Sequence, residues 1–296
     1  AIRVGEKGEN TVVFDTDLCA WRAGWTDGFL KTDPTRYGLI RALKPEGAIA
    51  FANPPAPGVA DSRGYFADPR NPKYGPLPRD WVRFKGLHVN GGDVVIQYEA
   101  GGASVYERVY LGGDEKNFIM SRRILVKGNK RGTQIQLANI PGAKWEIYKE
   151  LDSSGLKSVA SIKRPLTAER KIEGMRNEIG VTAGELKVTA KGVLAVSLSP
   201  QEKDVELLVQ HLKGNEVEVG EKLIAQCRKT LSAPVLAPGP RRWGEPIVTK
   251  GIVDRRKTPF AIDTITVPYK NPYNALMFTA GHDFMSNGEC YVAMAH

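Results

Sequence analysis

The stretch DVVIQYEAGGASVYERVY, residues 93–110, decides the fold class. β-branched and aromatic residues alternate with polar residues on both sides of Gly101 and Gly102, which predicts two antiparallel strands joined by a tight turn. Similar runs follow at intervals that are typical of a sandwich or barrel: residues 118–126, 133–138, 145–149, 186–189, 193–198 and 205–210. We therefore predict a mainly β protein, an antiparallel β-sandwich or barrel-like domain with long loops rich in Pro and Gly.

The composition is that of a folded chain. Its 296 residues suffice for one large domain or two ordinary ones. Hydrophobic residues make up 42% and charged residues 25%, a mixture that disordered chains lack. No apolar run approaches the roughly 18 residues that a membrane-spanning helix needs, so we expect no membrane span.

The net charge of +9 is compatible with a nucleic acid, an anionic surface or a glycan as partner. Nucleic-acid binders concentrate their positive charge, whereas the densest cluster here is Lys127, Lys130 and Arg131. No run of five cations occurs in the sequence. We therefore expect a solvated basic surface and no nucleic-acid partner.

The pattern along the chain predicts two parts. Residues 1–235 form the β-rich, sandwich-like domain, which contains a long Pro-rich loop at 31–80 and one short helix at 220–231. Residues 236–296 form a connector and further strands, at 262–267, at 275–279 and on either side of a turn at 286–288.

The most site-like cluster lies where the long loop meets the β core. It contains Arg79, Asp80, Trp81 and His88, and Trp25 is a further aromatic candidate. Aromatic rings beside cationic and polar side chains suit sugars and other polar ligands. A second interpretation stays open, in which Trp81 fills the core below the loop and Arg79 pairs with Asp80.

His282 and Asp283 form a second, weaker candidate. Neighbouring residues on a strand point to opposite faces, which favours a structural role at the turn over a catalytic pair. Asp15 and Asp17 have a spacing that glycosidase carboxylates can adopt, but this spacing is not specific, and we favour capping of a turn at the end of a strand.

Familiar chemical motifs are absent from the sequence. The four histidines lack the spacing of a metal motif, so we expect no metal site, and no nucleophile elbow or phosphate-binding loop occurs. Cys19, Cys227 and Cys290 form neither CxxC nor the haem motif CxxCH. One disulfide with one free thiol and three buried thiols both remain open.

Several short motifs carry a family resemblance. They are VFDTD (13–17), FADPR (66–70), YGPLPRDW (74–81), KGLHVNG (85–91), DTITVP (263–268), NPY (271–273) and DFMSNG (283–288). In this order they resemble an uncharacterised extracytoplasmic β-rich domain found at the front of long planctomycete and verrucomicrobial proteins. In those proteins the domain precedes a β-propeller similar to sorbosone-type sugar dehydrogenases, and a c-type cytochrome domain often follows.

The resemblance implies a periplasmic or extracellular protein whose partners are propeller and cytochrome domains or chains. It implies no cofactor within this chain and c-type haem in a companion. One hypothesis is a binding or scaffold module with a glycan ligand. The alternative is a composite oxidoreductase site, completed by the propeller, in which His88, His282 and Asp283 take part. Residues 281–296 resemble the first strands of a propeller blade, and the edge at 289–295 is expected to be covered.

Overall fold

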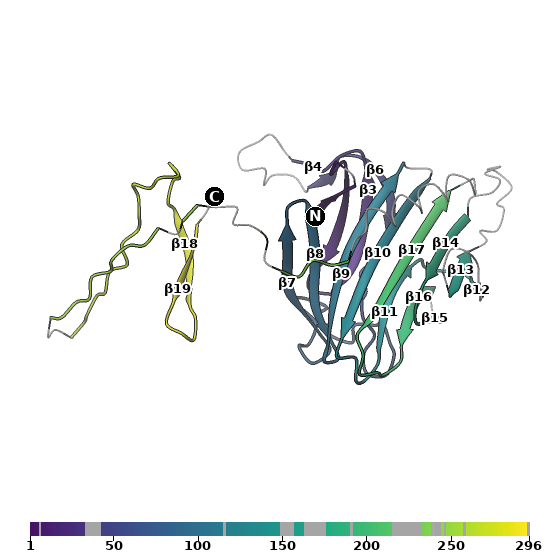
Figure 1. Ribbon diagram of the computed structural model, residues 1–296. Helices are drawn as coiled ribbons and strands as arrows, with labels where there is room; N and C mark the ends of the chain where they lie inside the picture. Colours follow the sequence, from purple (N-terminus) through teal and green to yellow (C-terminus); the bar gives the residue numbers. More distant parts are fainter. Residues whose placement is uncertain are drawn as a thin grey trace. The chain divides into compact units, whose positions relative to one another are not determined.

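The computed structural model consists of antiparallel sheets (Figure 1). It describes residues 1–5, 7–32, 43–114, 117–148, 157–162, 176–189, 192–214, 233–237, 239, 244–245, 247–256 and 259–294. Every regular element within these residues is a strand, which confirms the mainly β prediction, and the helix expected at 220–231 lies outside them. Among the same residues, no helix has the length and apolarity needed to cross a membrane.

The chain divides into two compact units, Ala1–Pro240 and Arg241–His296. The domain boundaries inferred from the sequence, 1–235 and 236–296, stay a prediction.

One layer of the first unit is an eight-stranded sheet (Figure 1). In spatial order its strands are β12 (Trp145–Tyr148), β13 (Ser158–Ile162), β14 (Arg176–Val181), β17 (Val205–Gly214), β10 (Phe118–Lys127), β9 (Ala103–Gly113), β8 (Asp93–Ala100) and β7 (Val82–Asn90). The hairpin predicted for residues 93–110 is β8–β9, and Gly101 and Gly102 have positive φ in its turn. The sheet ends in two different edge strands, β12 and β7, so it is not a closed barrel.

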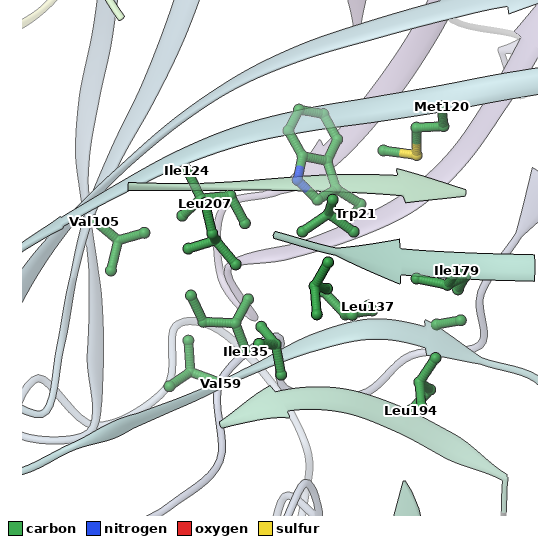
Figure 2. Close-up of a cluster of buried hydrophobic side chains, with 14 of the residues drawn as sticks. Trp21, Val59, Val105, Met120, Ile124, Ile135, Leu137, Ile179, Leu194 and Leu207 are labelled. Atoms are coloured by element: carbon green, nitrogen blue, oxygen red, sulfur yellow. The ribbon is translucent and has the colours of Figure 1, made fainter. Parts of the chain in front are cut away.

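Two smaller sheets supply the opposing layer. One contains β1 (Ile2–Val4), β2 (Asn10–Asp15), β3 (Ala20–Thr26) and β6 (Ala48–Ala52), and the other contains β11 (Thr133–Asn139), β16 (Val193–Leu198) and β15 (Glu185–Thr189). Figure 2 shows Ile124 and Leu207 of the large sheet in one cluster with Trp21, Ile135 and Leu194 of the smaller sheets. A shared core between opposed sheets is the arrangement of a β-sandwich. A separate pair, β4 (Leu30–Lys31) and β5 (Lys44–Pro45), lies outside these sheets.

A buried ionic network ties the three sheets together. The Glu107 carboxylate of β9 accepts hydrogen bonds from Arg122 Nε (2.9 Å) and Nη2 (3.0 Å), Tyr98 Oη (2.5 Å) and Trp21 Nε1 (2.8 Å). Arg122 Nη1 also donates to the carbonyl oxygen of Gln136 on β11, at 2.9 Å. Glu107 and Arg122 are only 1% and 4% exposed, so the network replaces water for both charges. Burial, followed by the negative charge of Glu107, raises the pKa of Tyr98, which therefore stays a donor.

The Pro-rich loop is shorter than predicted. β5 and β6 lie inside the expected range 31–80, because β6 finds a partner in β3 and the proline-rich sequence begins only after it. The remaining irregular segment, residues 53–81, joins the two smaller sheets. Gly58 N donates to Leu18 O at 2.8 Å, while Val59 forms an isolated β-bridge with Ile135 of β11.

The second unit contains the predicted hairpin. It is formed by β18 (Thr279–Phe284) and β19 (Cys290–Met294), and Gly288 has positive φ in the turn. The strand predicted at 262–267 is wrong, since Thr264 makes only an isolated bridge to Ile252. The one predicted at 275–279 is also wrong, since β18 begins at Thr279. Both runs have residues that favour strands but lack a neighbouring strand among the described residues, and a strand requires such a partner.

The buried network predicts a large stability difference between two neighbouring arginines. Arg122→Met leaves the Glu107 carboxylate buried without its counter-charge, so we expect a loss of roughly 3–5 kcal/mol in the free energy of unfolding. Arg123→Met is the matched control, because Arg123 pairs with Glu206 on the half-exposed face and should cost about 1 kcal/mol or less. Urea denaturation measures both, and equal losses would contradict a structural role for the network.

The double variant tests the pairing itself. Glu107→Gln combined with Arg122→Met should lose less stability than the sum of the two single changes, because neither charge is then buried alone. Strictly additive losses would show that the two side chains act independently.

His211 predicts a pH dependence of stability. It lies on β17 with Nε2 2.6 Å from Asn177 Oδ1, and burial, followed by the charges of Lys213 and Arg122, lowers its pKa from 6.5 to about 4. The folded protein therefore holds His211 neutral, whereas the unfolded chain gains a proton as the pH falls below 6.5. The free energy of unfolding should decrease between pH 6.5 and about 4 by a contribution of roughly 3 kcal/mol.

The measurement compares urea denaturation at several pH values. His211→Gln should flatten the pH dependence in this window. An identical slope in wild type and His211→Gln would refute the assignment.

Candidate functional site

A shallow hollow brings together two clusters that lie 51 residues apart in the sequence, Arg79 with Asp80 and Lys130 with Arg131. Its volume is about 370 Å³, at the lower end of the range for ligand pockets. It is lined by Arg79, Asp80, Glu99, Gly101, Gly102, Gly128, Lys130 and Arg131. The predicted cluster at Arg79 and Asp80 therefore shares one site with Lys130 and Arg131, which belong to the densest basic cluster of the sequence.

The first wall is a turn that the fold holds at both ends. Trp81 N donates to Pro78 O at 3.0 Å, and its indole Nε1 donates to Val59 O at 3.1 Å. Gly101 N donates to Trp81 O, which extends the β7–β8 ladder to the end of the turn. Arg79 and Asp80 consequently project from a fixed backbone, and both are exposed.

The second wall is the β10–β11 connection, which is anchored by a buried asparagine. Asn129 Nδ2 donates to Ser199 O at 3.0 Å, and its Oδ1 accepts from Thr133 Oγ1 at 2.7 Å. Asn129 is 1% exposed, whereas its neighbours Lys130 and Arg131 are exposed. The loop thus presents two cations from a backbone whose position is set by the core.

Glycines form much of the remaining wall. Gly101, Gly102 and Gly128 have φ values of +57°, +94° and +68°, which the two tight turns require. A Cβ placed on any of them would meet no heavy atom within 4 Å. Their structural role is the turn, and the space beside them is open to a ligand.

The charges around the hollow are largely uncompensated. In the described part of the chain, no acidic side chain forms an ion pair with Arg79, Lys130 or Arg131. The predicted alternative of an Arg79–Asp80 pair is likewise not seen there. Glu99 is already paired with Lys85, whose Nζ lies 3.2 Å from its carboxylate.

His88 belongs to a polar strip that leads along the outer face of the large sheet to this hollow. The strip consists of His88, Gln97, Tyr106 and Lys127. His88 Nε2 lies 2.8 Å from Gln97 Oε1, Gln97 Nε2 donates to Tyr106 Oη at 3.3 Å, and Lys127 Nζ lies 5.9 Å from the Tyr106 ring. Glu99, in the wall of the hollow, is two residues beyond Gln97 on β8 and so shares its face.

The two candidate tryptophans are held by the fold. Trp25 is buried on β3, and its Nε1 donates to Phe29 O at 2.7 Å. Trp81 is half-buried and packs against the main core, as the second interpretation of the cluster expects. Trp25 therefore offers no accessible ring, and Trp81 acts through the turn that it fixes.

His282 and Asp283 lie in the second unit, on β18 of the terminal hairpin. Both are exposed; His282 pairs in register with Val292 and Asp283 with Tyr291. The His282 ring contacts Phe284 edge-on, with centroids 5.9 Å apart, while Asp283 Oδ1 accepts from Phe284 N at 2.8 Å. The two side chains have separate local partners.

Asp15 and Asp17 belong to a turn. β2 ends at Asp15, whose Oδ1 accepts from the backbone nitrogens of Asp17 and Leu18, both at 3.0 Å. Asp15 Oδ2 also pairs with Arg22 at 3.1 Å. These contacts favour turn capping over a carboxylate pair on one strand face.

Neither described cysteine forms a disulfide, and Cys227 lies outside the described residues. Cys19 and Cys290 are free thiols. Burial, then the negative charges of Asp15 and Glu107, raises the pKa of Cys19 to about 12, so its thiol stays protonated. Across the described positions, no group of three His, Cys, Asp or Glu side chains could hold a metal ion.

Arg70 gives the FADPR motif (66–70) a structural role. Its guanidinium group pairs with Asp68 and donates to the carbonyl oxygens of Tyr74 (3.1 Å), Gly75 (3.0 Å) and Pro76 (2.5 Å). The hydrogen bonds from Arg70 also lower the pKa of Asp68. This clamp shapes the segment that leads into the Arg79 turn.

Lys130 and Arg131 line the hollow, although the sequence pattern predicts only a solvated basic surface for them. Their place beside the hollow could have been predicted from strand pairing. β10 runs antiparallel to β9, so the connection after β10, which contains Gly128, returns to the start of β9. That connection must lie beside the β8–β9 turn.

Comparison with known proteins identifies part of the chain. No curated protein matches it. A family model described as a domain of unknown function (DUF6797) matches residues 12–107, about a third of the chain. The match includes the Arg79 turn and the hairpin glycines of the hollow, whereas Lys130 and Arg131 lie beyond it. Residues 12–107 are thus similar to a domain whose function is unknown.

Proposed function

We propose that this chain is an extracytoplasmic binding and scaffold module that recognises a glycan within a larger, cytochrome-linked protein related to sugar dehydrogenases. The hollow lined by Arg79, Asp80, Lys130 and Arg131 is the observation that carries this proposal. The motif resemblance supports the extracytoplasmic setting and the propeller and c-type cytochrome partners.

The chemistry of the hollow and the strip suits a sugar ligand. Arginine presents a planar fork of donors that matches adjacent oxygen atoms, and Asp80 supplies acceptors for hydroxyl groups. The half-exposed ring of Tyr106 adds an aromatic surface beside the donors and acceptors of His88 and Gln97. Because the backbone of each wall is fixed, little conformational entropy is lost when a ligand binds.

The second unit supports the scaffold part of the proposal. No hydrophobic residue is buried among its described residues up to Val292, and large apolar groups are strongly exposed, among them Val248 (90%), Tyr269 (75%) and Leu276 (70%). A two-stranded sheet such as β18–β19 is only marginally stable by itself. Exposed apolar surface of this kind is typical of an interface, here with a neighbouring β domain.

Affinity electrophoresis of the 296-residue chain through gels containing a broad panel of polysaccharides tests glycan binding. We expect at least one polymer to retard the protein. Arg79→Ala should weaken that binding by about tenfold, the loss of roughly 1.4 kcal/mol, because the cation contacts the ligand directly. Arg255→Ala removes a matched exposed arginine of the second unit and should leave the retardation unchanged.

Two results would contradict the proposal. The first is a folded protein, verified by circular dichroism, whose mobility no polymer alters. The second is an Arg79→Ala variant that binds as wild type does, which would move the site away from the hollow.

A further inference from the structure

We infer that the glycan bound in the hollow is acidic and carries carboxylate or sulfate groups. This inference rests on the proposed function and specifies its ligand class. It follows from a difference between loops: some loop arginines have an acidic partner in their own turn, whereas the cations of the hollow have none in the described structure.

Three other loop arginines are neutralised locally by an acid two residues earlier. Three pairs share this arrangement, with nitrogen–oxygen distances of 2.7–2.8 Å: Asp61–Arg63, Asp68–Arg70 and Asp254–Arg256. In each pair the aspartate also accepts a hydrogen bond from the backbone nitrogen of the arginine, so one carboxylate fixes both the turn and the charge. Arginines on the loops of this protein can thus be compensated within their own turn.

The loops of the hollow depart from this arrangement. Position 129, two residues before Arg131, is the buried Asn129, which supplies the turn contacts without a negative charge. Arg79 has Asp80 as its neighbour, yet no ion pair joins them in the described structure. Three cations therefore surround one hollow, facing Asp80 and a Glu99 that already pairs with Lys85.

Gathering like charges on fixed backbones is unfavourable unless an anion compensates them. The repulsion between like charges grows as they approach one another and as water is excluded between them. An anionic ligand removes this repulsion and gains charge-assisted hydrogen bonds to arginine. A neutral sugar would leave all three cations uncompensated.

The polar strip suits a polymer better than an isolated anion. From Gln97 to Gly101 the strand advances by about 13 Å, so one chain can reach from His88 and Tyr106 into the hollow. Lys127 lies along this course, and its ion pair with Asp204 is long, at 3.9 Å. An acidic polysaccharide would place one charged residue among Arg79, Lys130 and Arg131 and neighbouring sugars on the strip.

Polymers that share a backbone and differ in charge test the inference. Dextran sulfate against dextran measures the effect of sulfate, and de-esterified against methyl-esterified polygalacturonate measures that of carboxylate. We expect the charged member of at least one pair to bind at least tenfold more tightly. Raising the salt concentration should weaken that binding, because surface ion pairs are screened.

Two charge-reversal variants separate the site from the overall charge. Lys130→Glu with Arg131→Glu should weaken binding of the acidic polymer at least tenfold. Arg255→Glu with Lys270→Glu changes the net charge equally, at exposed positions of the second unit, and should retain most of the binding. Circular dichroism of both variants verifies that they fold.

Each remaining outcome is decisive. Equal binding of charged and neutral polymers would overturn the acidic ligand and leave the proposed glycan function intact, whereas binding of no polymer would overturn both. Equal weakening in the two double variants, or equally tight binding of duplex DNA, would show attraction to any polyanion and overturn the inference. A preference for sulfate or for carboxylate would support it and name the anion.

Discussion

The Glu107–Arg122 ion pair is the constraint on which the first unit depends. Both charges are buried, so each must be satisfied by the protein. Their partners come from β3, β8 and β11 as well as from β9 and β10, which means that three sheets must meet in one geometry. A one-residue slip of β9 or β10 would turn one charge to the opposite face. The network therefore specifies register and sheet packing together.

The hollow follows from the same arrangement. Its walls are the β8–β9 turn, the β10–β11 connection and the turn that precedes β7. The first two are connections of strands that the network aligns, and Trp81 fixes the third through Val59, which is bridged to β11. The residues of each wall do not have to fix its conformation themselves, because the core holds each wall at its ends. Charged residues can occupy the turns without loss of order.

Local pattern was sufficient to predict some elements and insufficient for others. The hairpin of residues 93–110 and the turn at 286–288 were predictable because strand and turn signals adjoin. The run at 262–267 has the composition of a strand but lacks a partner, which only the fold can supply. Polar and apolar residues alternate around Ile135, which predicts a half-exposed Gln136. Gln136 is instead buried, and its backbone carbonyl oxygen accepts a hydrogen bond from Arg122. The hollow could not be predicted from the sequence, because only the tertiary structure places Lys130 and Arg131 beside Arg79.

The structural unit is larger than the region that the family model matches. The match ends at Glu107, in the middle of β9, and therefore before Arg122, the counter-charge of that residue. A domain limited to residues 12–107 would contain the buried carboxylate without its guanidinium partner and would leave β9 without β10. It would also contain Arg79 and Asp80 without Lys130 and Arg131. Both the ionic network and the hollow thus require the strands that follow, so the stability of the fold and the walls of the hollow depend on the sandwich as a whole.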